Sequence, residues 1–155
     1  MDRLIPDCIR ALEAGVPIRI RSPDAVRPWQ HVLDPLAGYL TLAERLHNEG
    51  VDFAEAWNFG PSDVGARPVR WVVDQLIRDW GGGASWEEDQ APQPHEANYL
   101  KLDCSKARAR LGWHPRWPLN VALEKTAAWH RAYGGGADMR DATLAQISEH
   151  ESFDR

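Results

Sequence analysis

The sequence has little of what marks several large classes of protein. Its only two cysteines, Cys8 and Cys104, lie far apart and in no metal-type spacing, so it predicts neither a zinc site nor a disulfide framework. No apolar run approaches the roughly 20 residues that a membrane-spanning helix needs. The net charge of −5 leaves no basic excess for a nucleic-acid surface. An anionic ligand would therefore be held by a few placed arginines rather than by the overall field of the protein.

The beginning of the sequence also lacks the apolar stretch of a secretory signal peptide, because Asp2 and Pro6 stand where that stretch would lie. We therefore expect a cytoplasmic protein whose two cysteines pack as small apolar residues. A chain of 155 residues with 43% hydrophobic residues is long enough to form one soluble domain.

Apolar periodicity predicts several helices. A stripe from Ile5 to Leu12 ends at Gly15, and a second stripe from Val69 to Trp80 follows Pro68 and ends at Gly81. Asp34 followed by Pro35 is typical of an N-cap and first helical residue, and Asp103 and Asn120 are predicted to cap two further helices. The helices after these three caps are predicted to run to Glu49, to Leu111 and to about Tyr133, and residues 141–151 are weakly helical.

Short alternating or apolar segments between the helices predict strands. These segments are residues 17–21, 54–59, 84–87 and 98–102, with a further extended piece at residues 28–32. In the first of them Arg19 and Arg21 fall on the same face. Helices interspersed with short strands predict an α/β, or α+β-like, fold with small mixed sheets.

The residues of nucleotide-dependent catalysis are missing from the sequence. It has no glycine-rich turn of the G-x-G-x-x-G type, where backbone N–H groups would hold a dinucleotide pyrophosphate. Gly60 and Gly65 have phosphate-loop spacing, but Ala66-Arg67 follows where Lys-Ser/Thr is required. No tyrosine is followed four residues later by a lysine. We therefore predict no catalytic, cofactor-binding or metal-binding residue in this chain, and we expect the chain alone to be inactive.

Four segments together carry a resemblance to a known family. They are Ile20–Val32, which contains Arg-Pro-Trp-Gln-His-Val, then Trp57–Pro61, Tyr99–Ala107 and Leu111–Trp117. In this order they resemble the C-terminal, sugar-nucleotide-binding part of the extended short-chain dehydrogenase/reductases, the NAD-dependent epimerase/dehydratase family. The first and last segments are most similar to the CDP-glucose 4,6-dehydratase branch.

The resemblance implies a fold and a reaction. The chain would be the C-terminal lobe of such an enzyme without most of the Rossmann domain, with residues 1–135 as the sugar-nucleotide-binding lobe and residues 136–155 as a weakly helical tail. Full-length members oxidise glucose C4 with bound NAD, eliminate water across C5–C6 and return the hydride to C6. NAD is therefore expected for a full-length enzyme and not for this chain.

The resemblance also implies ligand-binding residues. Arg27 would grip the diphosphate, which suits the planar fork of a guanidinium; the alternative is a surface ion pair with Asp24 or Asp34. Asn58 would donate to a phosphate oxygen or, alternatively, cap its own turn. Arg3 would reach a phosphate or remain solvated at a helix start.

The remaining expected contacts concern the base and the ribose. Ile20 and Arg21 would lie beside the pyrimidine, or would only form an edge strand. His95 would touch the ribose or a phosphate, or would be exposed in its Pro-rich loop. Trp29 and Trp113 are interpreted mainly as core residues, with a ligand platform as the alternative.

The expected ligand is a CDP-sugar, and no nucleic acid or membrane partner is expected. The predicted strand ending at Phe59 would normally join the Rossmann sheet, so we expect exposed apolar faces and association with a separately encoded Rossmann half or with a second copy. The alternative is a non-catalytic nucleotide-sugar-binding or protein-interaction module derived from the same lobe. A related dehydratase or epimerase acting on another nucleotide base is a further possibility.

Overall fold

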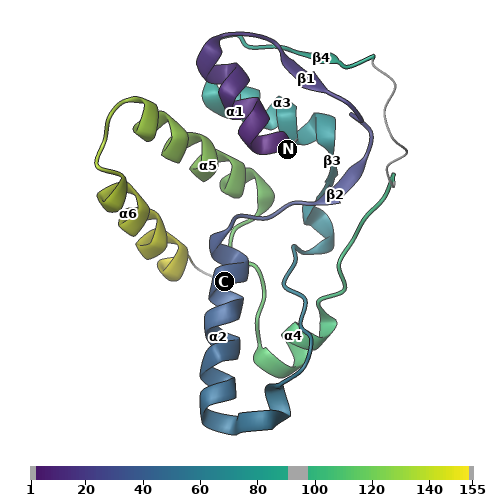
Figure 1. Cartoon of the computed structure of the whole chain (residues 1–155), viewed down its shortest axis with the longest axis vertical. Helices are drawn as coiled ribbons and strands as arrows, with labels where there is room; N and C mark the ends of the chain where they lie inside the picture. The colour runs from purple at the N-terminus through teal and green to yellow at the C-terminus, as the bar shows by residue number, and fades with distance from the viewer. Residues whose placement is uncertain (1–2, 91–97, 154–155) are drawn as a thin grey trace.

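The computed structural model describes residues 3–90 and 98–153. In these residues six α-helices and two small sheets form a broad upper part and a narrow lower part (Figure 1). The upper part contains the N-terminal helix and the sheets, and the lower part is built around one long helix. The predicted α/β class with small mixed sheets is confirmed.

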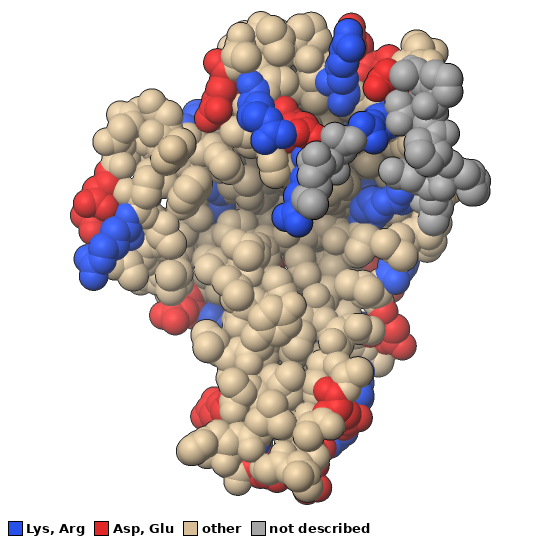
Figure 2. Space-filling model, in the orientation of Figure 1, with Lys and Arg blue, Asp and Glu red and all other residues tan. Residues whose placement is uncertain are grey.

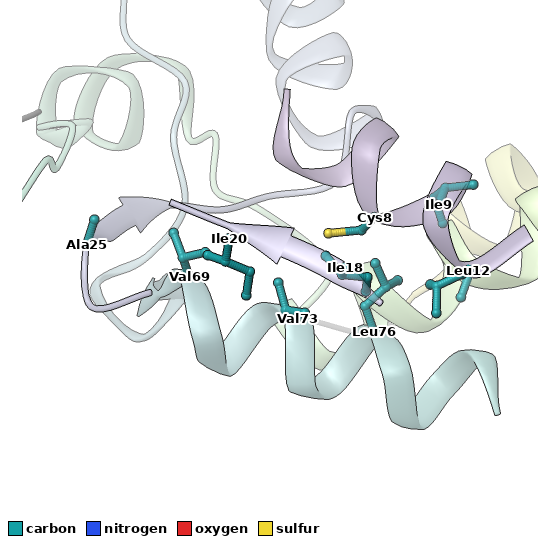
Figure 3. Close-up of a cluster of buried hydrophobic side chains, with 10 residues drawn as sticks. Cys8, Ile9, Leu12, Ile18, Ile20, Ala25, Val69, Val73 and Leu76 are labelled. Carbon is teal, nitrogen blue, oxygen red and sulfur yellow. The ribbon is translucent and has the colours of Figure 1, made fainter. Parts of the chain in front are cut away.

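The core of the upper part lies between two helices and one strand. Helix α1 (Leu4–Ala14) and helix α3 (Val69–Trp80) enclose strand β1 (Ile18–Ile20) (Figure 3). The predicted apolar stripes of both helices form this core, and α3 has the predicted bounds. Gly15 ends α1 with a φ of 65°, a left-handed conformation that glycine adopts without steric cost.

The two sheets have two strands each. Strand β1 pairs in parallel with β4 (Trp86–Glu88), and β2 (Val26–Pro28) pairs antiparallel with β3 (Ala66–Pro68). The strand predicted at residues 98–102 is reduced to a single bridge between Tyr99 and Val26.

The lower part has its own apolar cluster. Helix α2 (Leu33–Glu49), the 3₁₀ turn η1 (Gly50–Phe53) and helix α4 (Ser105–Leu111) surround it. The buried members of this cluster are Phe53, Phe59, Cys104, Ala107, Leu111 and Trp113.

Two predictions for this lower part are corrected by the structure. The helix expected to begin at Pro35, with Asp34 as its N-cap, begins two residues earlier at Leu33 with Val32 as N-cap, and the Asp34 carboxylate turns into the protein instead of capping the helix. Residues 54–59 form no strand, because no described neighbouring strand supplies ladder hydrogen bonds to them. A second 3₁₀ turn, η2 (Asp63–Gly65), follows this segment.

The chain ends with two antiparallel helices, α5 (Leu119–Gly134) and α6 (Met139–Ser152) (Figure 1). The N-cap of α5 is Pro118 and not Asn120, whose predicted capping role is wrong because it lies inside the first turn. Asp138 caps α6, since its carboxylate accepts hydrogen bonds from the backbone N–H groups of Arg140 and Asp141.

Both cysteines are buried, as the sequence predicted, and both are free thiols. None of the helices within residues 3–90 and 98–153 is long and apolar enough to cross a membrane.

Candidate functional site

A cleft of about 500 Å³ lies where the start of α1 faces β1 and β2. Four of the six predicted binding residues line it, namely Arg3, Ile20, Arg21 and Arg27. In Figure 2 Lys and Arg side chains gather on the upper part of the molecule, whereas the lower part is mostly uncharged on this face. The other residues that line the cleft are Leu4, Ile5, Pro6, Asp7, Arg19, Ser22, Ala25, Pro28, Trp29 and Val69.

Strand β1 and the residue that follows it supply two of the arginines. Ile18 and Ile20 are buried in the core, so Arg19 points to the opposite, exposed face. Arg21 lies two residues after Arg19, so the alternation directs it to the same face, and it is exposed. Arg19 was not predicted as a binding residue, although its position on one face with Arg21 was the signal that could have identified it.

Arg27 lies in the middle of β2, opposite Arg67 of β3. It is half-buried, and its Nη1 donates a 3.0 Å hydrogen bond to the carbonyl of Val26. The two carboxylates considered as alternative partners have other contacts: Asp24 is 2.9 Å from Arg70, and Asp34 is 2.8 Å from His150.

The charges lining the cleft are mainly positive. Arg19 forms an exposed ion pair with Glu87, at 3.0 Å between Nε and Oε1, and Asp7, the one acidic residue among the described residues of the lining, pairs with Arg10. Four guanidinium groups around one cleft can bind a doubly charged diphosphate through charge-assisted, bidentate hydrogen bonds.

The structure does not bring Asn58 to this cleft. Asn58 is exposed in the segment before Gly60, and its Nδ2 donates a 3.2 Å hydrogen bond to the carbonyl of Asp103. This contact joins segments 45 residues apart, so it is not the cap of its own turn that was the alternative for Asn58. His95, the sixth predicted residue, lies outside the described residues.

The two tryptophans considered as core or platform residues differ. Trp113 is 6% exposed, packs edge-on against Phe59 and donates its indole N–H to the carbonyl of Asp34. Trp29 is only half-buried, and its indole donates to the carbonyl of Arg67 at 2.9 Å. Trp29 therefore forms part of the cleft wall, whereas Trp113 belongs to the lower core.

A second cavity, of about 480 Å³, lies beside the cleft and shares Ile5 and Trp29 with it. We call it the α5/α6 groove; its further lining residues are Gln30, His31, Val32, Leu33, Leu119, Ala122, Leu123, Thr126, Trp129, His130, Thr143 and Gln146. Burial lowers the pKa of His31 in this lining to about 4; the carboxylate of Asp34 opposes this shift, and the neighbouring His150 adds to it.

The described residues offer no group of three or more His, Cys, Asp or Glu side chains that could hold a metal ion. The NAD expected for a full-length enzyme has no glycine-rich turn to bind to in this chain, so the residues present do not fit that cofactor.

Nearly the whole chain is similar to part of a known enzyme. The chain is 50% identical over 151 residues to the CDP-glucose 4,6-dehydratase of Salmonella typhimurium, a match that covers 97% of the chain and 42% of the relative. The chain thus spans less than half the length of this relative, and the matched region is its C-terminal part. No family model matches the sequence.

Solved structures with low sequence identity share the fold. The dTDP-glucose 4,6-dehydratase of Bacillus anthracis, in complex with NAD, is 19% identical with a TM-score of 0.69, covering 87% of this chain and 41% of that one. The UDP-glucuronic acid 4-epimerase of Bacillus cereus, in complex with UDP-glucuronic acid and NAD, is also 19% identical, with a TM-score of 0.71 and coverages of 85% and 40%.

Proposed function

Because the chain belongs to the extended short-chain dehydrogenase/reductase family, as a counterpart of the C-terminal part of its members, we propose that it binds a CDP-sugar. In this proposal it is the substrate-binding portion of a CDP-glucose 4,6-dehydratase-like enzyme, a lyase that makes a 4-keto-6-deoxy sugar nucleotide for deoxysugar synthesis in the cytoplasm. Residues 1–135 form the ligand lobe, residues 136–155 form the tail, and the chain alone is inactive.

The observation that carries this proposal is the arginine-lined cleft. Arg3 from the residue before α1, Arg21 from the end of β1 and Arg27 from β2 line one cavity of about 500 Å³. Such a volume is in the usual range of small-molecule sites. The arginines would bind the diphosphate, and Ile20 and its strand would lie against the base.

Isothermal titration of the chain with CDP and CDP-glucose tests this proposal. Replacing Arg27 with Ala removes one guanidinium fork and should weaken CDP binding by about 1.5–3 kcal/mol, roughly 10- to 150-fold. The matched control is Arg108→Ala, because Arg108 is an exposed arginine on α4 that lines none of the cavities described above. We expect the control to bind like the unmodified chain.

Titrations with UDP, dTDP and GDP compare the nucleotide bases. CDP should bind most tightly; a stronger ligand among the others would replace the CDP assignment and leave the diphosphate site intact. Equal losses in Arg27→Ala and Arg108→Ala would show that only the general charge of the protein attracts the nucleotide, and would contradict the site.

We also propose a partner for the exposed face of α2. Val32, Leu36, Tyr39 and Leu40 follow one another at helical spacing, and all four are exposed, with Leu40 at 73%. The relative contains a further 58% of chain that has no counterpart here. A separately encoded Rossmann half would cover this face, and self-association would cover it in its absence.

Complementation tests this partner. The N-terminal part of a CDP-glucose 4,6-dehydratase, produced separately, should co-elute with the chain and yield the 4-keto-6-deoxy product in the presence of NAD. Leu40→Glu should abolish co-elution, whereas Leu144→Glu, at a 47% exposed position on α6, should not. If the chain binds CDP-sugar as a stable monomer and does not co-elute with the N-terminal part, it is instead a non-catalytic binding module.

A further inference from the structure

Helix α6 is attached to the rest of the protein mainly through polar contacts. Within Met139–Ser152, all of which the structure describes, His150 is the one buried residue. Toward α5, Gln146 donates to the carbonyl of Lys125, Thr143 accepts from the indole N–H of Trp129, and Lys125 pairs with Glu149 at 2.7 Å. A helix attached in this way depends on a few directional contacts and little on apolar burial.

A buried polar contact is made at the end of α6. His150 Nε2 lies 2.8 Å from Oδ1 of Asp34, which is fully buried at the start of α2. The same Oδ1 accepts a 2.7 Å hydrogen bond from the backbone N–H of Arg116. The guanidinium of Arg116 in turn donates to the carbonyl of His150 at 3.1 Å. Three segments distant in the sequence therefore meet at one carboxylate.

A second imidazole completes this cluster. His31 and His150 both pack edge-on against the ring of Trp117, with centroids 4.7 Å and 5.0 Å away. The Nδ1 of His31 accepts a hydrogen bond from the backbone N–H of Leu33, so the neutral ring carries its proton on Nε2. One carboxylate therefore faces two imidazoles in a site from which water is largely excluded.

The cluster disfavours a positive charge on the His31 imidazole. His150 contacts Asp34, whose other oxygen, Oδ2, is buried and has no hydrogen-bond partner among the described residues. A positive charge on His31 would be desolvated and repelled by His150, and these two effects outweigh its attraction to Asp34. The low pKa of His31, about 4, agrees with this geometry.

We propose that His31, Asp34 and His150 form an acid-released clasp that holds α6 against α2 and thereby keeps the α5/α6 groove closed on one side. Thr143 and Gln146 of α6 belong to the wall of that groove, so release of the helix widens it. The other titratable or charged groups around the clasp are Arg116, Lys125, His130 and Glu149.

Hydrogen exchange of the full chain, corrected for the intrinsic effect of pH, tests the clasp. Between pH 7.5 and pH 4.5 the protection of α6 amides should fall at least tenfold more than that of α3 amides. His31→Gln keeps a hydrogen-bond acceptor for Leu33 but cannot gain a charge, so it should move the loss of α6 protection to lower pH by one unit or more. The matched control His130→Gln changes another histidine of the same groove and should leave the profile unchanged.

A second variant covers the case in which His31→Gln does not fold. His150→Gln removes the imidazole that pairs with Asp34 and should expose α6 selectively at pH 7.5, with α3 still protected. The clasp would be overturned if α6 and α3 lost protection together at every pH, or if His31→Gln, folded, followed the unmodified chain.

Discussion

Gly38 on α2 lies directly against the ring of Phe59, so that a Cβ atom at Gly38 would stand 2.3 Å from Phe59 Cδ1. Phe59 cannot easily move away, because it packs edge-on against Trp113 on one side and Tyr39 on the other. This close approach holds the segment after η1 against α2, even though that segment forms no strand.

Gly38→Ala should therefore destabilise the protein. The overlap costs about 1–3 kcal/mol, of which the better helix propensity of alanine recovers at most about 1 kcal/mol. Urea unfolding measures the difference. Gly134→Ala is the control, since a Cβ there meets nothing within 4 Å and α5 should become slightly more stable. Equal stability of the two variants would contradict the contact.

Leu76 and Leu40 both lie on helices, but replacing each with alanine should change the free energy of unfolding by very different amounts. Leu76 on α3 is fully buried, so Leu76→Ala should lower the free energy of unfolding by about 2–5 kcal/mol. Leu40 on α2 is 73% exposed, and Leu40→Ala should change it by less than about 0.5 kcal/mol. A large loss with Leu40→Ala in the isolated chain would show that a second copy already covers α2.

The two cysteines should resist thiol reagents in the folded protein. Cys8 and Cys104 are both buried, and burial, helped by the charge of Asp7, raises the pKa of Cys8 to about 12. A coloured disulfide reagent at pH 8 should therefore titrate no thiol before unfolding and two afterwards. Leu40→Cys places a thiol at an exposed position and should add one rapidly reacting group.

The stability of the protein should decline in mild acid because of His31. Its pKa is lowered from 6.5 to about 4 in the folded state, so the unfolded chain binds the proton more tightly. The resulting stability is complete above pH 6.5 and is lost as the pH falls toward 4. The loss amounts to about 2 kcal/mol at pH 5. Urea unfolding at pH 7.5 and 5.0 measures it, and in His31→Gln this part of the pH dependence should vanish.

Local patterns predicted much of the fold. The apolar stripe after Pro68 predicted α3 with its true bounds, and Gly15 correctly marked the end of α1. The predictions failed where the outcome depends on distant residues. Residues 54–59 have a strand-like composition but no neighbouring strand among the described residues. Asp34 is of a residue type that often caps helices, but here it lies buried beside His150.

The residues of the candidate site were likewise predicted only in part from local sequence patterns. Alternation within β1 determined that Arg19 and Arg21 share a face, and the family resemblance pointed to Arg3 and Arg27. Only the packing of α1 against β1 and β2 decided which of these side chains line one cleft and that Asn58 lies elsewhere. The sequence by itself thus predicted the helices, some of their ends and the resemblance to the family, because these depend on local periodicity and motifs. The tertiary structure decided the burial of Asp34, the exposure of α2 and the membership of the cleft, because these depend on contacts between distant segments.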